Sequence, residues 1–423
     1  MTAPSSPVAG TVRVALERVI AKVNTLSAGG PGWTRPSYSD LESAAHAMVE
    51  AEAATLGLSV SRDAAGNLFA RMEGRDPDAV PLYVGSHLDT VAEGGAYDGL
   101  AGVAGALALA GALRAGGHTP EADLVVTVTR AEESVWFPVS YAGSRAGLGR
   151  LSRVELEARR VDTQRSLADH MRDQGYDPEA VARLVPPRPA RFLEFHIEQG
   201  PVLHEAGEPY AIVTAIRGGL RYRAARVDGI WAHSGAAPRA GRADAVVAFS
   251  DLVLAMDKVW EEMLAEGADL TVTFGRVDAA GLAHAMAKVA GTLGFCLDMR
   301  SCDAATLDAA DRRLRAEIAR IEAARPGIRY DLGQQSRSQP AQLSAAMADF
   351  VAAGAAARGD RPRHMLSGGG HDAAAFAAAG WESVMVFIRN WNGSHCPEEG
   401  MDIEDLALAV ESVHEALRRE GGR

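Results

Sequence analysis

The sequence predicts an α/β protein into which a smaller α+β domain is inserted. The first half of the chain and its last part alternate strand-length apolar runs with segments of helical length, which is typical of α/β folds. The stretch between them follows the order βαββαβ, the split βαβ or ferredoxin-like arrangement. We therefore expect one domain made of residues 1–214 and 335–423, interrupted by a second domain over residues 215–334.

The α/β pattern rests on apolar strands with helices between them. Near-continuous apolar runs suit the strands of a central sheet that is covered on both faces. These runs span residues 81–86, 123–129, 191–197 and 383–388. Segments of helical length span residues 100–115, 156–173, 341–357 and 402–418.

The inserted segment alternates apolar and polar residues more openly, so we expect four antiparallel strands with two helices on one face. Its predicted strands are residues 221–229, 269–277, 293–300 and 328–333. Its predicted helices are residues 242–265 and 303–324.

Composition excludes several classes of partner. The net charge of −12 argues against nucleic acid or an anionic membrane as the main partner. The three cysteines form neither a disulfide framework nor a CxxC metal clip, so we expect a reducing, cytoplasmic setting. No secretory signal is evident at the start. The longest apolar stretch, residues 100–113, is too short to span a bilayer.

Side chains that can bind metals follow the predicted core strands. His87 ends the first strand, with Asp89 two residues on and Asp98 beyond the Gly94-Gly95 turn. Functional groups gather at the carboxyl ends of strands in open α/β sheets. A carboxylate such as Asp89 commonly holds the second ring nitrogen of a metal-bound histidine. The same pattern could also form a capped loop, with Asp98 as a helix N-cap.

Two adjacent glutamates, Glu132 and Glu133, follow the second core strand. Neighbouring residues of an extended chain point in opposite directions, so one could bind a metal while the other faces a substrate. The alternative is a pair of solvated loop glutamates. The aromatic residues Trp136 and Phe137 come directly after them and indicate a partly buried turn.

Two more histidines complete the pattern at the third and fourth strands. His196 lies at the end of the third strand, and His395 follows the last one. A lone histidine on an apolar strand is usually a core residue, but four strand ends in a row carry such groups. The predicted metal ligands are His87, Asp98, Glu133, His196 and His395. This set suits two divalent ions that share one carboxylate, and Glu132 could serve as a general base.

Two further clusters could be functional. His233 lies with Arg239 and Arg242 before the first helix of the inserted domain. His371 and Asp372 follow a glycine loop at the start of a helix, where N–H groups can bind an anion. A solvated helix cap and a flexible loop capped by Asp372 are the plain alternatives.

Together these residues resemble the M20-type metallo-amidohydrolases, and among them the hydantoinase/carbamoylase branch. That branch includes N-carbamoyl-L-amino-acid hydrolases, allantoate amidohydrolases and β-ureidopropionases. The motifs of the resemblance occur in the expected order over nearly the whole chain. They are GGPGWTRPSYSDLE (29–42), DAAGNLFARMEG (63–74), GSHLDTVAEGGAYDG (85–99), AEES (131–134), FHIEQGPVL (195–203), AHSGAAP (232–238), FCLDMR (295–300), SGGGHDA (367–373) and GSHCPEE (393–399).

The resemblance implies a di-metal catalytic domain with named ligands. One ion would be held by His87, Asp98 and His196, and the other by Asp98, Glu133 and His395. Glu132 would be the general base, and Asp89 would orient His87.

The resemblance also implies that the inserted domain is a lid through which the chain forms a homodimer. His233 would complete the active site, in related enzymes from the partner subunit, and help to stabilise the oxyanion. Arg300 would bind the substrate carboxylate, which a guanidinium suits. His371 and Gln199 would contact the substrate.

The chain departs from the family pattern mostly where the substrate would bind. Ala287 and Ala290 stand where the family carries an Asn that binds the substrate carboxylate and a Pro. Arg217, Arg389 and Trp391 also differ from the common pattern, and we count Arg217 and Trp391 as candidate substrate contacts. Losing one polar anchor can change substrate preference strongly.

The leading hypothesis is metal-dependent hydrolysis of a linear amide or ureido C–N bond in a small acid, most simply an N-carbamoyl or related N-acyl amino acid. The ions could be zinc or manganese, and cobalt or nickel also suit histidine and carboxylate ligands. One alternative is an enzyme with the same metal site that acts on an unusual amide or an aromatic amine. The aromatic residues near the site favour this alternative; they are Trp136, Phe137 and Trp391. Another is a non-catalytic binding protein with this fold.

Overall fold

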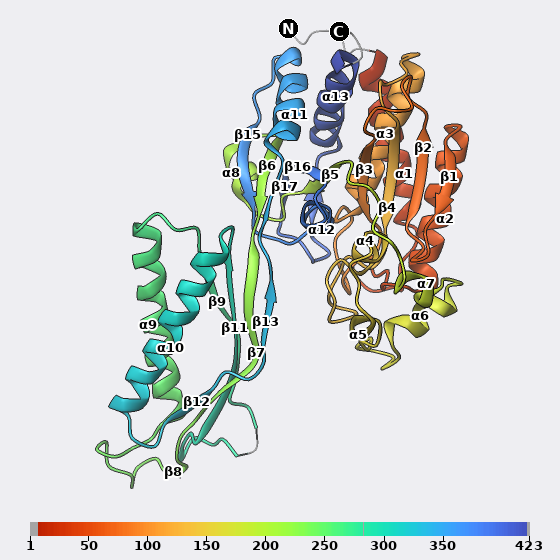
Figure 1. Cartoon of the computed structure of the whole chain (residues 1–423). Helices are drawn as coiled ribbons and strands as arrows, with labels where there is room; N and C mark the ends of the chain where they lie inside the picture. The colour runs from red at the N-terminus through yellow and green to blue at the C-terminus, as the bar shows by residue number, and fades with distance from the viewer. Residues whose placement is uncertain (1–6, 282, 421–423) are drawn as a thin grey trace. The chain divides into compact units, whose positions relative to one another are not determined.

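A computed structural model describes residues 7–281 and 283–420 of the chain (Figure 1). Its contacts divide the chain into two compact units, which we describe separately. Unit 1 is Met1–Thr214 with Gln342–Arg423, and unit 2 is Ala215–Ala341. Unit 2 thus continues past the residue 334 expected from the sequence, because residues 335–338 form a strand that pairs within it.

Unit 1 is built on a nine-stranded sheet. Its strands are β1 (Ser59–Arg62), β2 (Leu68–Met72), β3 (Leu82–His87), β4 (Leu124–Thr129), β5 (Arg191–Ile197), β6 (Tyr210–Ile216), β14 (Ala341–Gln342), β15 (Arg363–Ser367) and β16 (Glu382–Ile388). Their order is β1-β2-β4-β3-β5-β16-β6-β14, and β15 also pairs with β6. The central strands β4, β3, β5 and β16 are parallel, whereas β2 and β6 run antiparallel to them.

Helices pack on this sheet and extend from it. They are α1 (Pro7–Val23), α2 (Asp40–Thr55), α3 (Leu100–Ala115), α4 (Ala142–Gly147), α5 (Arg153–Leu156), α6 (Leu167–Asp173), α7 (Pro178–Val181), α8 (Val202–Ala206), α11 (Ala345–Arg358), α12 (Asp372–Ala378) and α13 (Ile403–Glu420). A two-stranded ribbon, β17 (Asn390–Trp391) with β18 (Gly400–Met401), follows the last strand of the sheet.

The alternation of side chains along β5 shows which helices cover which face. Leu193 and Phe195 join the large apolar core that α1, α3, α11 and α13 also form. Phe192 points to the other face, where its ring stacks on Phe376 of α12 at 3.8 Å. His196 has the same parity as Phe192, so it faces α12.

The small alanine and glycine residues of α3 let this helix pack closely on the sheet. A Cβ on Gly102 would lie 2.1 Å from the carbonyl oxygen of Phe195, so the helix touches the backbone of β5.

One predicted helix of unit 1 was wrong. Residues 156–173 do not form one helix, because a Ser166–Asp169 capping box starts α6 afresh at Leu167.

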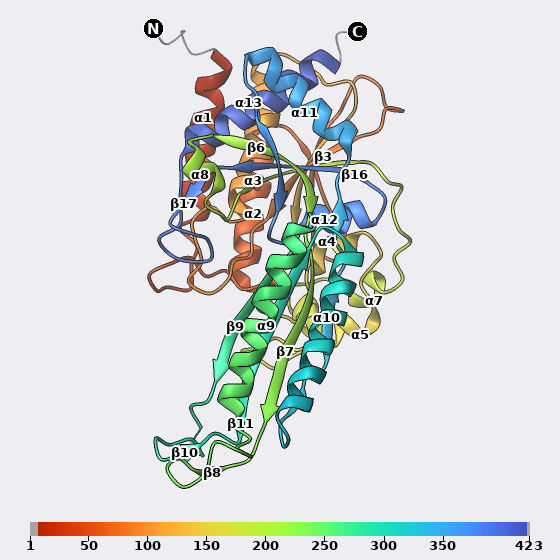
Figure 2. The same cartoon turned by 90° about the vertical axis from the view of Figure 1, so that its left-hand side faces the viewer.

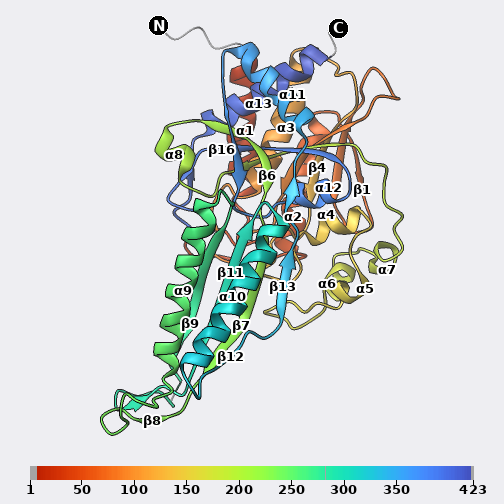
Figure 3. The same cartoon turned by 60° about the vertical axis from the view of Figure 1, so that its left-hand side comes forward.

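Unit 2 follows the expected βαββαβ order in its main strands and its two helices, to which a two-stranded ribbon and one further strand are added. Its elements are β7 (Gly218–Asp228), β8 (Ala232–His233), α9 (Ala245–Ala265), β9 (Thr271–Asp278), β10 (Lys288–Val289), β11 (Thr292–Ser301), α10 (Ala304–Ala324), β12 (Arg329–Asp331) and β13 (Gln335–Ser338). The antiparallel sheet has the order β12-β7-β11-β9, with β13 also beside β7. Both α9 and α10 lie on one face of it (Figures 2 and 3), and their apolar sides share a core with β7 and β11.

No membrane-crossing helix is found over residues 7–281 and 283–420, since no helix there is both long enough and apolar enough.

Candidate active site

The chemically interesting side chains of unit 1 meet at one edge of its sheet. His87 is the last residue of β3, and His196 lies one residue before the end of β5. Glu132 and Glu133 follow the end of β4, and His395 follows β16. These four strands are parallel, so their carboxyl ends lie at the same edge, as the sequence predicted.

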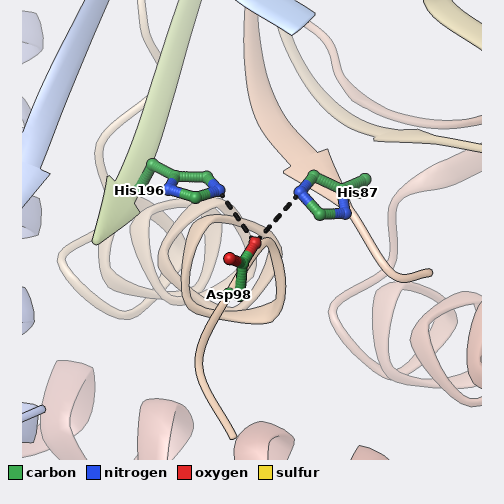
Figure 4. A group of neighbouring side chains, drawn as sticks. All are labelled: His87, Asp98 and His196. Atoms are coloured by element: carbon green, nitrogen blue, oxygen red, sulfur yellow. Dashed lines mark ion pairs between the residues drawn. The ribbon is translucent and has the colours of Figure 1, made fainter. Parts of the chain in front are cut away.

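Asp98 lies at the centre of this edge, and each of its two oxygens faces a different group. Its Oδ1 is 3.4 Å from Nε2 of His87 and 3.3 Å from Nε2 of His196 (Figure 4). Its Oδ2 is 3.3 Å from Nε2 of His395, which lies 3.4 Å from Oε1 of Glu133. Two clusters of potential ligands therefore share one carboxylate.

Glycine lets the loop bring Asp98 to this position. Gly99 has a φ of 66°, and a Cβ there would lie 2.5 Å from the His87 ring. Gly99 is also the residue that precedes α3, and no side chain caps that helix. The alternative in which Asp98 is an N-cap is therefore not what the structure has.

Burial and close contacts shift the pKa values of these groups. Burial alone would raise the pKa of Asp98, but the neighbouring His196, His395 and His87 hold it well below its usual range. Burial raises the pKa of Glu132 well above that of an ordinary glutamate and that of Glu133 to about 7. The hydrogen bond to Asp98 raises the pKa of His395 to about 9.

Asp89 connects the histidine strand to the glutamate turn. Its backbone oxygen lies 3.0 Å from Nδ1 of His87, and its Oδ1 lies 3.4 Å from the same nitrogen. The carboxylate also accepts the backbone N–H groups of Glu132 and Glu133 at 3.0 and 3.2 Å, and the Ser37 hydroxyl at 2.6 Å. One fully buried side chain thus orients His87 and holds both glutamates.

A buried ion pair fixes the turn from its other side. Ala131, directly before the two glutamates, has a φ of 49°, which is a strained conformation for alanine. Its N–H donates to Oε1 of Glu42 at 2.9 Å. The other oxygen of Glu42 accepts from Arg130 Nη1 at 2.8 Å and from the Tyr38 N–H at 2.7 Å. The first turn of α2 therefore helps to place the glutamates.

The residues present fit divalent metal ions. Imidazole nitrogens and carboxylate oxygens are ligands that zinc, manganese, cobalt and nickel accept. Nε2 of His196 is buried and forms no hydrogen bond, although it points at Asp98. A buried polar atom that makes no hydrogen bond is costly, and an ion held between His196 and Asp98 would satisfy it.

Three predicted substrate contacts in unit 1 have defined surroundings. Nε2 of Gln199 donates to Oδ2 of Asp98 at 2.8 Å, so this residue lies within the cluster. The His371 ring is buried and packs edge-on against His196 at 4.4 Å, and burial holds its pKa well below the ordinary value. Trp391 lies in β17, with its ring 6.0 Å from that of His204.

Asp372 is not a helix cap, and the aromatic residues Trp136 and Phe137 are buried. Asp372 does not cap α12, because its carboxylate accepts the hydroxyls of Thr129 and Ser144 instead. Trp136 and Phe137 belong to a buried apolar cluster, and the Trp136 indole donates to a backbone oxygen at 2.7 Å. Both side chains therefore pack in the core of unit 1.

Three residues with predicted functional roles, His233, Arg300 and Arg217, belong to unit 2. His233 is exposed, and its Nδ1 accepts the N–H groups of Gly235 and Ala236, both at 3.2 Å. Arg300 pairs with Asp298 at 2.8 Å. Arg217 forms a fork with both oxygens of Asp269, each 3.0 Å from its Nε, so the guanidinium has an internal structural partner.

Sequence reasoning missed several buried acids around the cluster. Glu194 accepts from the Ser86 hydroxyl and the Ala373 N–H, both at 2.8 Å. Glu399 lies against the Asp98 loop, and Glu42 holds Ala131 as described above. Burial raises the pKa of Glu194 and of Glu399 to about 7. For Glu194 the two-residue spacing to His196 on one strand face was an available signal. Glu399 closes the motif GSHCPEE, but nothing near it in sequence indicated that its partner is the Asp98 loop.

The chain resembles known hydrolases over almost its whole length. The family model described as Peptidase family M20/M25/M40 matches residues 76–419. An N-carbamoyl-L-amino-acid amidohydrolase of Paenarthrobacter aurescens is 32% identical over 95% of this chain and 97% of its own. An allantoate amidohydrolase of Bacillus subtilis is 29% identical over 91% and 92%. The crystal structure of a hydantoinase/carbamoylase family amidase from Burkholderia multivorans matches with a TM-score of 0.87 at 28% identity, covering 97% and 98%.

Proposed function

Because this chain belongs to the peptidase family M20/M25/M40, we propose that it is a metal-dependent hydrolase of a linear amide or ureido C–N bond in a small anionic compound. The substrates in the names of its relatives, N-carbamoyl-L-amino acids and allantoate, are of that class. An N-carbamoyl or related N-acyl amino acid is the substrate class that we favour.

The observation that carries this proposal is the position of Asp98 between two ligand clusters. In the proposal, His87, Asp98 and His196 hold one divalent ion, and Asp98, Glu133 and His395 hold a second. Such a pair of ions, when bound, activates water and polarises a carbonyl group. Zinc or manganese is the expected metal, and cobalt or nickel also suits these ligands.

Glu132 is the proposed general base. Its Oε2 lies 4.0 Å from Nε2 of His87, so the carboxylate is beside the proposed ligands without belonging to their clusters. Burial raises its pKa, which favours a group that takes a proton from water and passes it to the leaving nitrogen. Asp89 orients His87 and holds the N–H of Glu132 in place.

Residues of unit 2 are proposed to recognise the substrate. Nδ1 of His233 accepts N–H groups, so the neutral ring carries its proton on Nε2 and can donate it to a developing oxyanion. Arg300 is the proposed partner of the substrate carboxylate, with His371 and Gln199 as further contacts. We also propose a cytoplasmic homodimer formed through unit 2, in which His233 acts on the partner's site.

The two alternatives make different predictions. An aromatic amine substrate has lost part of its support, because Trp136 and Phe137 are core residues and Trp391 alone remains. A non-catalytic binding protein would not need Glu132 beside an intact ligand set. Neither alternative is favoured by a specific contact.

The test is a panel of N-carbamoyl, N-formyl and N-acyl amino acids and aromatic amides, assayed for released amine after each metal has been added back. We expect N-carbamoyl amino acids to react. Glu132→Gln should keep metal and fold but lose turnover by about 10²–10⁴-fold. Glu411→Gln is the matched control, because Glu411 is as buried as Glu132 but lies on α13 with Arg358. A near-normal rate for Glu132→Gln would refute its role.

A further inference from the structure

Glu399 lies in a close fit against the loop that carries Asp98. Its Oε1 accepts the backbone N–H groups of Tyr97 at 3.0 Å and Asp98 at 3.2 Å. Its Oε2 accepts the Ser394 hydroxyl at 2.9 Å. The side chain is 5% exposed. This carboxylate therefore joins the loop before α3 to the loop after β16.

Gly95 provides the space for this carboxylate. A Cβ on Gly95 would lie 2.1 Å from both Cδ and Oε1 of Glu399, which no real contact allows. Gly95 has no positive φ, so the absence of a side chain matters here for space rather than for backbone conformation. The glycine turn and Glu399 are thus complementary in shape, although about 300 residues separate them.

The loop that contains His395 is held partly by its own residues and partly by Gln199, whose N–H donates to Oδ1 of Asn390 at 3.0 Å. Asn392 and His395 both have φ values near 60°, a conformation that costs energy outside glycine. The Asn390 side chain donates to Gly393, and that of Asn392 donates to Glu398, at 2.9 and 3.0 Å. These bonds shape the loop but do not connect it to Asp98.

Three side chains make that connection. Nε2 of Gln199 donates to Oδ2 of Asp98 at 2.8 Å and lies 3.3 Å from Nε2 of His395. The Ser394 hydroxyl lies 3.1 Å from Oδ2 of Asp98 and bonds to Glu399, which in turn accepts the Asp98 N–H. The spacing between Asp98 and His395 thus depends on Glu399 and Ser394 together with Gln199. Both oxygens of Glu399 are occupied by these donors, and Glu399 belongs to neither of the two clusters that share Asp98.

We infer that Glu399 is a positioning residue that sets the spacing between Asp98 and His395, and thereby the affinity of the chain for the ion held by Asp98, Glu133 and His395. The inference rests on the proposed two-metal function. It distinguishes the two ions, because His87 and His196 are positioned by their strands and, for His87, by Asp89. Asp98, which Glu399 also holds, belongs to both clusters, whereas His395 lies on the loop that Glu399 joins to Asp98 and belongs to the second cluster alone.

The experiment measures metal content and affinity rather than turnover alone. Wild type, Glu399→Ala, Glu399→Asp and Glu399→Gln are stripped with chelator and titrated with Zn²⁺ and Co²⁺, with elemental analysis after dialysis in metal buffer. Glu399→Asp keeps the negative charge, but its side chain is shorter by one methylene group. Glu399→Gln keeps an oxygen that can accept the N–H groups of Tyr97 and Asp98. Glu411→Gln is the control for loss of a buried carboxylate elsewhere in unit 1.

We expect Glu399→Ala and Glu399→Asp to bind one of the two ions about 10–100-fold less tightly, while the other ion stays within a few-fold of wild type. Glu399→Gln should recover most of the lost metal affinity. In Glu399→Ala and Glu399→Asp, kcat should fall more than KM rises. The metal-free variants should unfold at temperatures close to that of the metal-free wild type. If Glu399→Ala folds poorly, the metal affinity of Glu399→Asp tests the inference in its place. Two ions bound with wild-type affinity, or an equal loss of both, would overturn the inference. A wild type that binds fewer than two ions would instead refute the proposed function and the inference with it.

Discussion

Replacing Asp89 by asparagine tests how the site is held together. The carboxylate accepts the Glu132 N–H on Oδ1, and the Glu133 N–H and Ser37 hydroxyl on Oδ2. An asparagine has one oxygen and one NH₂ group, so whichever way it turns, one backbone N–H meets another donor. The variant has almost the same volume, and the perturbation is therefore electrostatic rather than steric.

The size of the effect follows from the contacts. A hydrogen bond to a charged group is worth about 1.5–3 kcal/mol, and a buried donor without an acceptor costs a similar amount. We expect Asp89→Asn to lose about 2–4 kcal/mol of stability. With an unfolding entropy of about 2.1 cal/mol/K per residue, and a unit of roughly 300 residues, this lowers the melting temperature by about 3–6 °C.

The assay combines calorimetry of the metal-free protein with zinc titration and turnover. Metal affinity or activity should fall by about 10–100-fold, because His87 loses its orienting partner. Asp123→Asn is the matched control, since Asp123 accepts a backbone N–H from Gly74 at 2.8 Å just before β4, at the strand end remote from Glu132. An Asp89→Asn variant with wild-type stability and metal affinity would refute the view that this carboxylate holds the turn.

Three other predictions follow from single contacts. Gly99→Ala should weaken metal binding and stability together, because its Cβ would press on the His87 ring at a φ of 66°; unchanged zinc affinity would contradict this. Metal uptake should release a proton from His395, whose pKa is raised to about 9, so affinity should increase with pH up to that value and titration calorimetry in buffers of different ionisation enthalpy should detect the proton. Arg217→Met should lower the stability of unit 2 by about 1 kcal/mol or less through its partner Asp269 and leave KM unchanged, whereas a raised KM would support the predicted role of Arg217 as a substrate contact.

The parts of the site that could be predicted are those that local pattern determines. His87, Glu133, His196 and His395 follow or end core strands, and parallel strands bring their carboxyl ends to one edge. The sequence therefore indicated which groups would meet. The βαββαβ order of unit 2 was predictable for a similar reason, since apolar periodicity decides strand and helix there.

The parts that could not be predicted depend on partners far apart in the chain. The N–H of Ala131 needs an acceptor, but nothing near it in sequence shows that Glu42 supplies one. The same holds for the Asp98 N–H and Glu399. Trp136 was ambiguous because an aromatic side chain suits a core and a pocket equally, and only its packing decides. Long-range hydrogen bonds leave no local signature.

The insertion of unit 2 between β5 and β16 also determines when the centre can form during synthesis. Three members of one ligand cluster are made by residue 196, but β16 can pair with β5 only after the whole of unit 2 has left the ribosome. Closing a long loop costs little extra entropy per residue, so the delay is one of time rather than of equilibrium. At about 5–20 residues per second, the chain thus spends about 10–40 seconds with His87, Asp98 and His196 present and β5 unpaired on one side. A nascent chain in this state exposes an apolar strand edge until β16 is made.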